Sequence, residues 1–359
     1  KANIKKLDRQ LEDAEKGGYP HFLLKEINEQ PKTILKSSLI NKDELEKVSK
    51  LINKSNKIVL VGCGTASSAA LAGKYFFSNS NIQSENYGAY EFLPFVKFCN
   101  KDTVVIAISQ SGETADTLIA LKEAKKYGAK IVTIVNARGT TMERMSDIIL
   151  PIGAGPEIAV VSTKAMTAQL AILYLLSKTV ENKYNFAKKN IQKLSSELSK
   201  WMENGLSEDI IKLVKKIESH EHMYVIGKNL NYPAALEFGL KIKETSYIHA
   251  ESFTAGELKH GVITLIQKGT PCFVLASNDE VKNEVLSSAS ELKARGGKII
   301  GISPFESPEF NDLIKTPDMG ELTIFGNIIA GQLLGYYLGV SRGADPDKPR
   351  NLAKSVTVK

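Results

Sequence analysis

Short runs of β-branched and aliphatic residues alternate along this chain with longer amphipathic segments. Six such runs lie at residues 58–62, 103–109, 130–135, 223–227, 272–277 and 298–303. Each run has the length of a buried strand, and segments with helical periodicity separate them. Strands that alternate with helices form right-handed βαβ units. The pattern therefore predicts an α/β fold with doubly wound parallel sheets that carry helices on both faces.

The chain contains this pattern twice. Residues 57–71 align with residues 222–236 at an offset of 165, and residues 120–134 align with residues 288–302 at an offset of 168. Two segments in the same order at nearly the same offset indicate an internal repeat. A length of 359 residues also suits two domains of roughly 150 residues each. We therefore expect two doubly wound domains of the same topology.

The composition between and around the repeats predicts five parts. They are a lead segment over residues 1–44, a first domain over 45–190, a helical linker over 191–209, a second domain over 210–340 and a C-terminal tail over 341–359. The first 16 residues are strongly charged and predict a solvated helix. No signal peptide opens the chain, and its start at Lys1 in place of Met indicates a fragment of a longer protein or a processed end.

One segment raises the question of a membrane span. Residues 323–340 carry no charge over 18 positions, which is close to the minimum length for a spanning helix. The segment contains Asn327 and Gln332, and Gly331, Gly335 and Gly339 recur every fourth residue. Glycines at this spacing let another backbone approach closely. The pattern predicts a buried core helix and no membrane partner.

Composition excludes several classes of function. The net charge of +7 comes from 47 basic and 40 acidic residues that are spread along the chain, whereas a nucleic-acid-binding protein gathers its basic residues in a stripe. Cys63, Cys99 and Cys272 are scattered without the spacing of metal ligands. We expect no metal site, and free cysteines favour the reducing cytoplasm.

A hydroxyl-rich loop follows the second strand of the first repeat. Residues 109–114 read Ser-Gln-Ser-Gly-Glu-Thr and precede a helical segment. Free backbone N–H groups and the positive end of the helix dipole make such a junction suitable for an anion, and no nucleotide-binding loop is present. Two interpretations remain from the residues alone. The loop binds a single phosphate group, or it is a capping turn.

Two more polar loops lie in the first repeat, at residues 63–68 and 160–164. In doubly wound sheets, ligands bind beyond the carboxyl ends of the strands. Three hydroxyl-rich loops in one domain therefore favour a small polar pocket over three unrelated caps. The second repeat differs, because residues 278–280 read Asn-Asp-Glu and would repel phosphate.

The charged residues of the second repeat lie in a different segment. Glu237, Lys241 and Glu244 fall on one face of a predicted helix. This stripe is either a solvated salt-bridge ladder or a half-buried acid–base group suited to proton transfer. His260 follows in a Lys-His-Gly segment, and from the residues alone it is either structural or catalytic.

Several motifs occur together and in order. They are GGYPHFLLKEINEQP from residue 17, SQSGET from 109, STKA from 162, ALEFGLKIKE from 234, SYIHAE from 246, AGELKHG from 255 and PRNLAKSVTV from 349. With these motifs, the chain closely resembles the isomerase half of the glutamine–fructose-6-phosphate aminotransferase family over essentially its whole length. That half is a tandem pair of sugar-isomerase (SIS) domains, which matches the internal repeat.

The resemblance implies a reaction. Fructose 6-phosphate and ammonia give glucosamine 6-phosphate, through ring opening, a lysine imine and a ketose-to-aldose isomerisation that needs no cofactor. In the family an N-terminal glutaminase domain releases the ammonia, and the resemblance implies that this domain lies outside the present chain. The resemblance also implies a homodimer in the cytoplasm, and it implies that residues 1–18 are the remnant of the linker to the glutaminase domain.

The resemblance also implies roles for individual residues. Lys354 forms the imine, Glu244 moves a proton between C1 and C2, and His260 opens the ring from the neighbouring subunit. Glu237 and Lys241 support the acid–base chemistry. The implied substrate-binding residues are Thr65, Ser67, Ser109, Gln110, Ser111, Thr114, Val160, Ser162 and Ala353.

The chain departs from the common family pattern at three positions. Ala66 replaces a serine, Leu93 an arginine and Pro156 a threonine. Two other functions are compatible with SIS domains: a stand-alone glucosamine-6-phosphate deaminase or deglycase, and a module that senses a phosphosugar without turnover. The motifs at residues 17–31 and 349–358 favour the synthase over the deaminase. A sensor would leave the acid–base stripe and the tail lysine unexplained.

Overall fold

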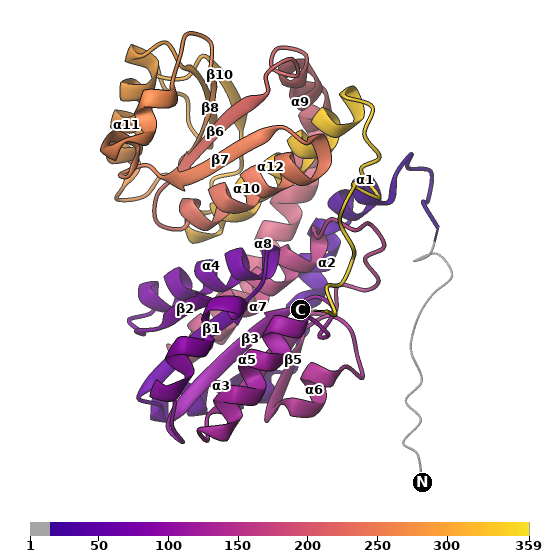
Figure 1. Ribbon diagram of the computed structural model, residues 1–359, viewed down its shortest axis with the longest axis vertical. Coiled ribbons are helices and arrows are strands. Elements are labelled where there is room, and N and C mark those ends of the chain that lie inside the picture. The colour runs from indigo at the N-terminus through magenta and orange to yellow at the C-terminus, as the bar shows by residue number, and fades with distance from the viewer. Residues whose placement is uncertain (1–14, 359) are drawn as a thin grey trace.

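The computed structural model describes residues 15–358 and shows two α/β units, one above the other (Figure 1). The solvated helix predicted over the first 16 residues lies almost wholly outside the described residues. Each unit is built on a five-stranded sheet, and every strand pair is parallel. The predicted fold class is confirmed.

The first sheet has the order β2-β1-β3-β4-β5. Its strands are β1 (Lys57–Gly62), β2 (Glu85–Gly88), β3 (Thr103–Ser109), β4 (Lys130–Val135) and β5 (Ile148–Pro151). All seven residues of the central strand β3 are buried. A strand covered on both faces has no solvent side, and this accounts for its apolar run from Val104 to Ile108.

The second sheet has the order β7-β6-β8-β9-β10, which is the same topology in the second copy. Its strands are β6 (His222–Gly227), β7 (His249–Thr254), β8 (Pro271–Leu275), β9 (Lys298–Ser303) and β10 (Asp312–Lys315). Strands β6 and β9 follow β1 and β4 at the two offsets found in the sequence. The repeat is therefore structural as well as sequential.

Twelve α-helices cover the sheets and their edges in the described part of the chain. They are α1 (Phe22–Asn28), α2 (Gln30–Ser37), α3 (Lys42–Lys54), α4 (Thr65–Asn79), α5 (Ala115–Lys126), α6 (Thr141–Met145), α7 (Lys164–Val180), α8 (Tyr184–Trp201), α9 (Ser207–Val214), α10 (Asn231–Ser246), α11 (Lys282–Ala294) and α12 (Thr323–Ser341). Helices α4, α5 and α7 correspond to α10, α11 and α12. The five domain boundaries stay a prediction.

Helix α12 is the apolar segment singled out in the sequence. It is the one helix within residues 15–358 long and apolar enough to span a membrane, yet 89% of its apolar window is buried inside the protein. It packs along α10. A Cβ atom on Gly331 would lie 2.4 Å from the Phe238 ring, and one on Gly339 would lie 2.5 Å from the Thr245 carbonyl oxygen. The glycines thus permit the predicted close helix packing.

The two units share one hydrophobic core. It includes α7 from the first unit and α12 from the second, and smaller clusters cover the outer face of each sheet beneath α5 and α11. The units also meet where α4 packs against α10, between the two sheets (Figure 1). This contact brings the N-terminus of α4 to the charged stripe of α10.

After α12 the chain turns back across the first unit, where it ends (Figure 1). The Asp347 carboxylate accepts hydrogen bonds from the backbone N–H groups of Phe22 (2.9 Å) and Leu23 (2.8 Å) at the start of α1. Further along, the Val356 carbonyl accepts one from Ala115 N–H (3.1 Å) at the start of α5. These contacts lay the tail over the carboxyl ends of the first sheet.

Candidate active site

A cavity of about 220 Å³ lies at the carboxyl ends of β1 and β3, where α10 and the tail also reach. Its lining residues are Cys63, Gly64, Thr65, Ala66, Ile108, Ser109, Gln110, Ser111, Thr114, Val160, Ser162, Gln169, Glu244, Lys354, Ser355 and Val356. The cavity thus combines the three predicted polar loops with one acid and one lysine from distant parts of the chain. A larger hollow of about 600 Å³ between α3 and α8 contains none of the predicted site residues.

The loop at residues 109–114 is held partly by its own hydroxyls. Ser109 Oγ accepts a hydrogen bond from Gly112 N–H (2.9 Å), and Ser111 Oγ accepts one from Glu113 N–H (3.2 Å). Thr114 precedes α5, but its hydroxyl makes no capping bond and lines the cavity. The loop is therefore both a turn and a source of hydroxyl donors near a helix N-terminus, where an anion is favoured.

Gly112 shows why the loop tolerates no side chain there. Its φ of +67° lies in the left-handed region, and a Cβ atom would approach Thr140 Oγ1 to 2.5 Å. The Glu113 carboxylate turns away and accepts a hydrogen bond from Thr141 N–H (2.7 Å). Steric contact and this anchor together fix the loop against α6.

The charged stripe of α10 is buried. Lys241 Nζ lies 3.2 Å from Glu237 Oε1 and 2.6 Å from Glu244 Oε2, and it donates to Thr65 Oγ1 at 3.0 Å. The side chains of Glu237 and Lys241 are 0% and 1% exposed, whereas Glu244 is 20% exposed and lines the cavity. This burial excludes the solvated salt-bridge ladder.

Burial and the neighbouring charges shift the pKa values of the stripe in opposite directions. Burial raises the pKa of Glu237 to about 7, although Lys241 partly opposes this shift. Burial alone would lower the pKa of Lys241, but Glu237 and Glu244 outweigh it and raise that pKa. Lys241 therefore stays an ammonium ion at neutral pH, whereas Glu237 keeps its proton over part of the pH range in which a free carboxyl group is ionised.

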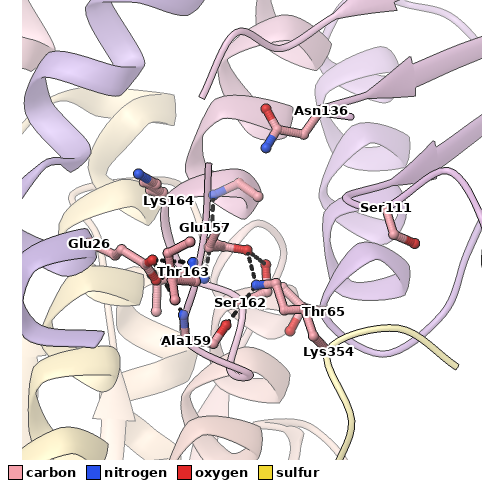
Figure 2. Close-up of polar contacts among 12 residues, drawn as sticks. Glu26, Thr65, Ser111, Asn136, Glu157, Ala159, Ser162, Thr163, Lys164 and Lys354 are labelled. Atoms are coloured by element: carbon pink, nitrogen blue, oxygen red, sulfur yellow. Dashed lines mark hydrogen bonds and ion pairs between the residues drawn. The ribbon is translucent and has the colours of Figure 1, made fainter. Parts of the chain in front are cut away.

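Lys354 reaches the cavity from the tail (Figure 2). Its Nζ donates hydrogen bonds to Glu157 Oε2 (2.7 Å) and to the Ala159 carbonyl oxygen (2.8 Å). The side chain is 27% exposed. A lysine that is partly desolvated and open to a pocket suits nucleophilic chemistry on a carbonyl group.

Glu157 is a functional candidate that the sequence did not reveal. Its carboxylate is fully buried and accepts hydrogen bonds from Thr163 N–H (2.8 Å) and Ala165 N–H (3.1 Å) at the start of α7. Burial alone would raise its pKa, but Lys354 and these donors outweigh burial and lower it. A single glutamate in a loop of small residues carries no pattern from which this role could be read.

A second buried carboxyl group lies behind the first. Glu26 from α1 accepts hydrogen bonds from Ile158 N–H and Ala159 N–H, in the loop that carries Glu157. Burial, followed by the charge of Glu157, raises the pKa of Glu26 to about 8. Its Oε2 has no hydrogen-bond partner within residues 15–358. Glu26 is therefore mainly neutral at pH 7.

Five of the predicted residues do not line the cavity: Glu237 and Lys241, which are buried behind Glu244 and Thr65, and three others. Ser67 is half-buried in α4, Ala353 is exposed beside Lys354, and His260 is exposed on a short 3₁₀ helix of the second unit. Their roles stay predictions, as do those of the residues that line the cavity. Among residues 15–358, no group of three His, Cys, Asp or Glu side chains is arranged to hold a metal ion.

Comparison with known protein families identifies the family to which the two repeats belong. The model of the SIS domain matches residues 51–178 and 216–307, one stretch in each repeat. The chain belongs to the SIS domain family. The first stretch contains β1 to β5 and the second contains β6 to β9, so this SIS chain carries the domain twice.

Similar proteins make the relationship more specific. This SIS chain is 43% identical to a glutamine–fructose-6-phosphate aminotransferase (isomerizing) of Clostridium tetani, a match that covers 96% of this chain and 60% of the relative. A protein of the same name from Thermococcus kodakarensis is 42% identical, with 97% and 60% covered. The chain thus spans about three fifths of the length of these curated relatives, and the resemblance inferred from the motifs is confirmed.

Solved structures of similar proteins have the same fold. The C-terminal domain of glucosamine-fructose-6-phosphate aminotransferase from Francisella tularensis superimposes with a TM-score of 0.82 at 30% identity, covering 93% of this chain and 100% of that one. A glucosamine-6-phosphate deaminase from Thermotoga maritima gives a TM-score of 0.74 at 24% identity, covering 93% and 99%. The second likeness shows the shared fold alone.

Proposed function

We propose that this SIS chain is the isomerase part of a glucosamine-6-phosphate synthase. It binds fructose 6-phosphate, opens the sugar ring, forms an imine with Lys354 and converts the ketose into glucosamine 6-phosphate with ammonia. One observation carries the proposal: a single cavity of about 220 Å³ is lined by the hydroxyl loop, by Glu244 and by Lys354. The names and coverage of the similar proteins support it.

The hydroxyl loop at residues 109–114 takes the phosphate group. Side chains of Ser109, Gln110, Ser111 and Thr114 line this end of the cavity, next to the N-terminus of α5. Hydroxyl and amide groups give short hydrogen bonds to phosphate oxygens, and the helix end stabilises the negative charge. Thr65, Val160 and Ser162 line the remaining wall, where the sugar chain lies.

Lys354 attacks the C2 carbonyl group of the open-chain ketose. The amine nitrogen forms a bond to C2, the carbonyl oxygen leaves as water, and a protonated imine remains. The positive imine makes the C1 proton more acidic. Ammonia adds to C2 of this imine and expels the Lys354 amine, so that C2 carries the ammonia nitrogen as a new imine. Glu244, which lies in the same cavity, then moves a proton from C1 to C2, and C1 becomes the aldehyde carbon.

Ring opening is the role that the family resemblance gives to His260. His260 is exposed and lies outside the lining, which fits donation to the site of a second copy in a homodimer. The ammonia comes from a glutaminase domain in the part of the relatives that the chain does not span. Free cysteines support a cytoplasmic location.

The test is nuclear magnetic resonance of fructose 6-phosphate mixed with the chain, with and without ammonium. We expect glucose 6-phosphate without ammonium and glucosamine 6-phosphate with it. If glucosamine 6-phosphate is instead consumed and none is formed, the chain is a deaminase. Saturable binding without any turnover would identify a sensor module.

A further inference from the structure

The Glu157 carboxylate is prepared for a cation independently of the tail. Thr163 N–H and Ala165 N–H bind its Oε1, and Ser162 Oγ binds Oε2 at 3.1 Å. All three donors come from the loop and helix that follow Glu157, so the anion is held before Lys354 arrives. The N-terminus of α7 adds favourable dipole charge.

The charges around Glu157 leave Lys354 as its counter-ion. The titratable groups around it are Glu26 from α1 and Lys354 from the tail, and the charge of Lys164 from α7 acts on Glu26. Lys164 is neutralised by Glu29, at 2.6 Å, and Glu26 is mainly neutral at pH 7 because burial raises its pKa to about 8. A buried carboxylate without a paired cation is costly, so the Lys354 ammonium is drawn to this place.

The tail is held on the C-terminal side of Lys354, where Ser355 Oγ donates to Ser111 Oγ (3.2 Å) and the Val356 carbonyl accepts from Ala115 N–H (3.1 Å), but it is exposed on the N-terminal side. There Ala353 is exposed, and Leu352 is 47% exposed. The Lys354 side chain is held by Glu157 and by the Ala159 carbonyl oxygen, which belongs to the loop held by Glu26 (Figure 2). The direction of the amine is therefore set by contacts with the first unit.

We propose that Glu157 is a positioning residue for Lys354, which it aims at the substrate carbonyl and from which it accepts the ammonium proton as the imine forms. The inference rests on the proposed function, because it requires Lys354 to form that imine. Glu157 acts through Lys354 and needs no contact with the sugar.

The step balances without any further reactant. The ammonium proton passes to the Glu157 carboxylate across the 2.7 Å hydrogen bond, and the free amine bonds to C2 while the C=O π bond breaks. The carbonyl oxygen takes up two protons, one returned by Glu157 and one released by the nitrogen after it has bonded to C2, and leaves as water. The charge of the ammonium ion reappears on the protonated imine, next to the same carboxylate.

The experiment measures imine trapping by borohydride with fructose 6-phosphate, followed by mass spectrometry of the chain. In Glu157→Gln the amide oxygen still accepts the backbone bonds at the start of α7, but the amide can neither pair with nor deprotonate Lys354. We expect the trapping rate to fall on the order of 100-fold. Affinity for glucitol 6-phosphate, which has no carbonyl group, should change less than about threefold.

Two further variants keep the test interpretable. Glu157→Asp retains the charge one methylene group farther from Lys354 and should recover part of the trapping rate. Glu197→Gln removes the carboxylate of an exposed pair with Lys200, away from the cavity, and should trap at the wild-type rate. Partial rescue by aspartate is a result that a purely structural role for Glu157 does not give.

The outcomes separate this inference from the proposed function. Trapping in Glu157→Gln at the wild-type rate overturns the inference while the imine chemistry stands. Equal loss of trapping, glucitol 6-phosphate binding and melting temperature in both Glu157 variants makes the residue structural and also overturns it. If the wild-type chain forms no trapped adduct, the proposed function fails and the inference fails with it.

Discussion

Two lysines with carboxylate partners lie at the same site, and their surroundings differ. Lys241 is 1% exposed on a helix between two carboxylates, and its neighbour Glu237 has a pKa raised to about 7 by burial. Lys354 is 27% exposed on the tail with one carboxylate, and it lowers the pKa of that group against the effect of burial. The first lysine is enclosed, whereas the second is open to the cavity.

This difference shows which lysine can react. Lys241 has three polar partners and almost no exposed surface, so an attack on a substrate would break a buried network. If Lys354 attacks a substrate, it gives up only two hydrogen bonds, and it does so from a partly exposed position on the tail. We infer that Lys241 fixes the acid Glu244 and joins the two units, while Lys354 carries the covalent chemistry.

The largest effect should come from Lys354→Ala. Without the amine no imine forms, so borohydride trapping should vanish and turnover should fall about a thousandfold or more. Phosphosugar binding should survive, because the hydroxyl loop is intact. Mass spectrometry and product formation measure both effects. An adduct that persists in this variant and disappears in a Lys241 variant would reverse the two assignments.

Lys241→Met should mainly affect stability. Removing one partner leaves two acids unpaired in a buried place, and the free energy of unfolding should fall by about 3–5 kcal/mol. Chemical denaturation measures this change. Lys212→Met is the matched control, since Lys212 pairs with Asp209 on the exposed surface and should contribute about 0–1 kcal/mol. Similar losses in both variants would contradict the buried network.

The two carboxylates should give opposite pH dependence of stability. The folded pKa of Glu237 is raised from 4.5 to about 7, so its stabilisation is present below pH 4.5 and is lost as the pH rises toward 7. The folded pKa of Glu157 is lowered, so its stabilisation is present above pH 4.5 and is lost as the pH falls. The pKa of Glu26 is also raised, so Glu26 adds to the loss of stability with rising pH whether or not the other two glutamates are substituted.

Variants separate these two trends. In Glu237→Gln the free energy of unfolding should fall less steeply between pH 4.5 and 7, by a slope that corresponds to at most about one bound proton. In Glu157→Gln the loss of stability below pH 4.5 should be less steep. Denaturation curves measured across this range give the slopes. A Glu237→Gln variant with the wild-type slope above pH 4.5 would show that this group is not perturbed by burial.

The smallest effect should be on the affinity for a phosphosugar in the cavity that Lys354 lines. Ser111→Ala should weaken phosphosugar affinity about tenfold, because one hydrogen bond to a charged group is lost, and it should leave the stability of the Lys241 network unchanged. Titration calorimetry with glucitol 6-phosphate measures the affinity. Unchanged affinity would mean that Ser111 serves only to hold Glu113 N–H in the turn.

The predictable part of the site lies in short contiguous motifs. The loop at residues 109–114 and the stripe of Glu237, Lys241 and Glu244 each act within one or two helical turns, so their spacing alone places them together. The pairing of Glu157 with Lys354 joins residues 197 positions apart, and no local period encodes such a pair. Glu26 was missed for the same reason.

The sequence by itself determined the two parallel sheets, their shared topology and the buried glycine-containing helix. These follow from the alternation of apolar and polar residues and from a repeat that can be read directly. Only the tertiary structure decided which charged side chains are buried and which lysine faces the cavity. Burial and pairing depend on how the tail, α1 and α10 pack against the first sheet, and this long-range packing sets the energies of the charges.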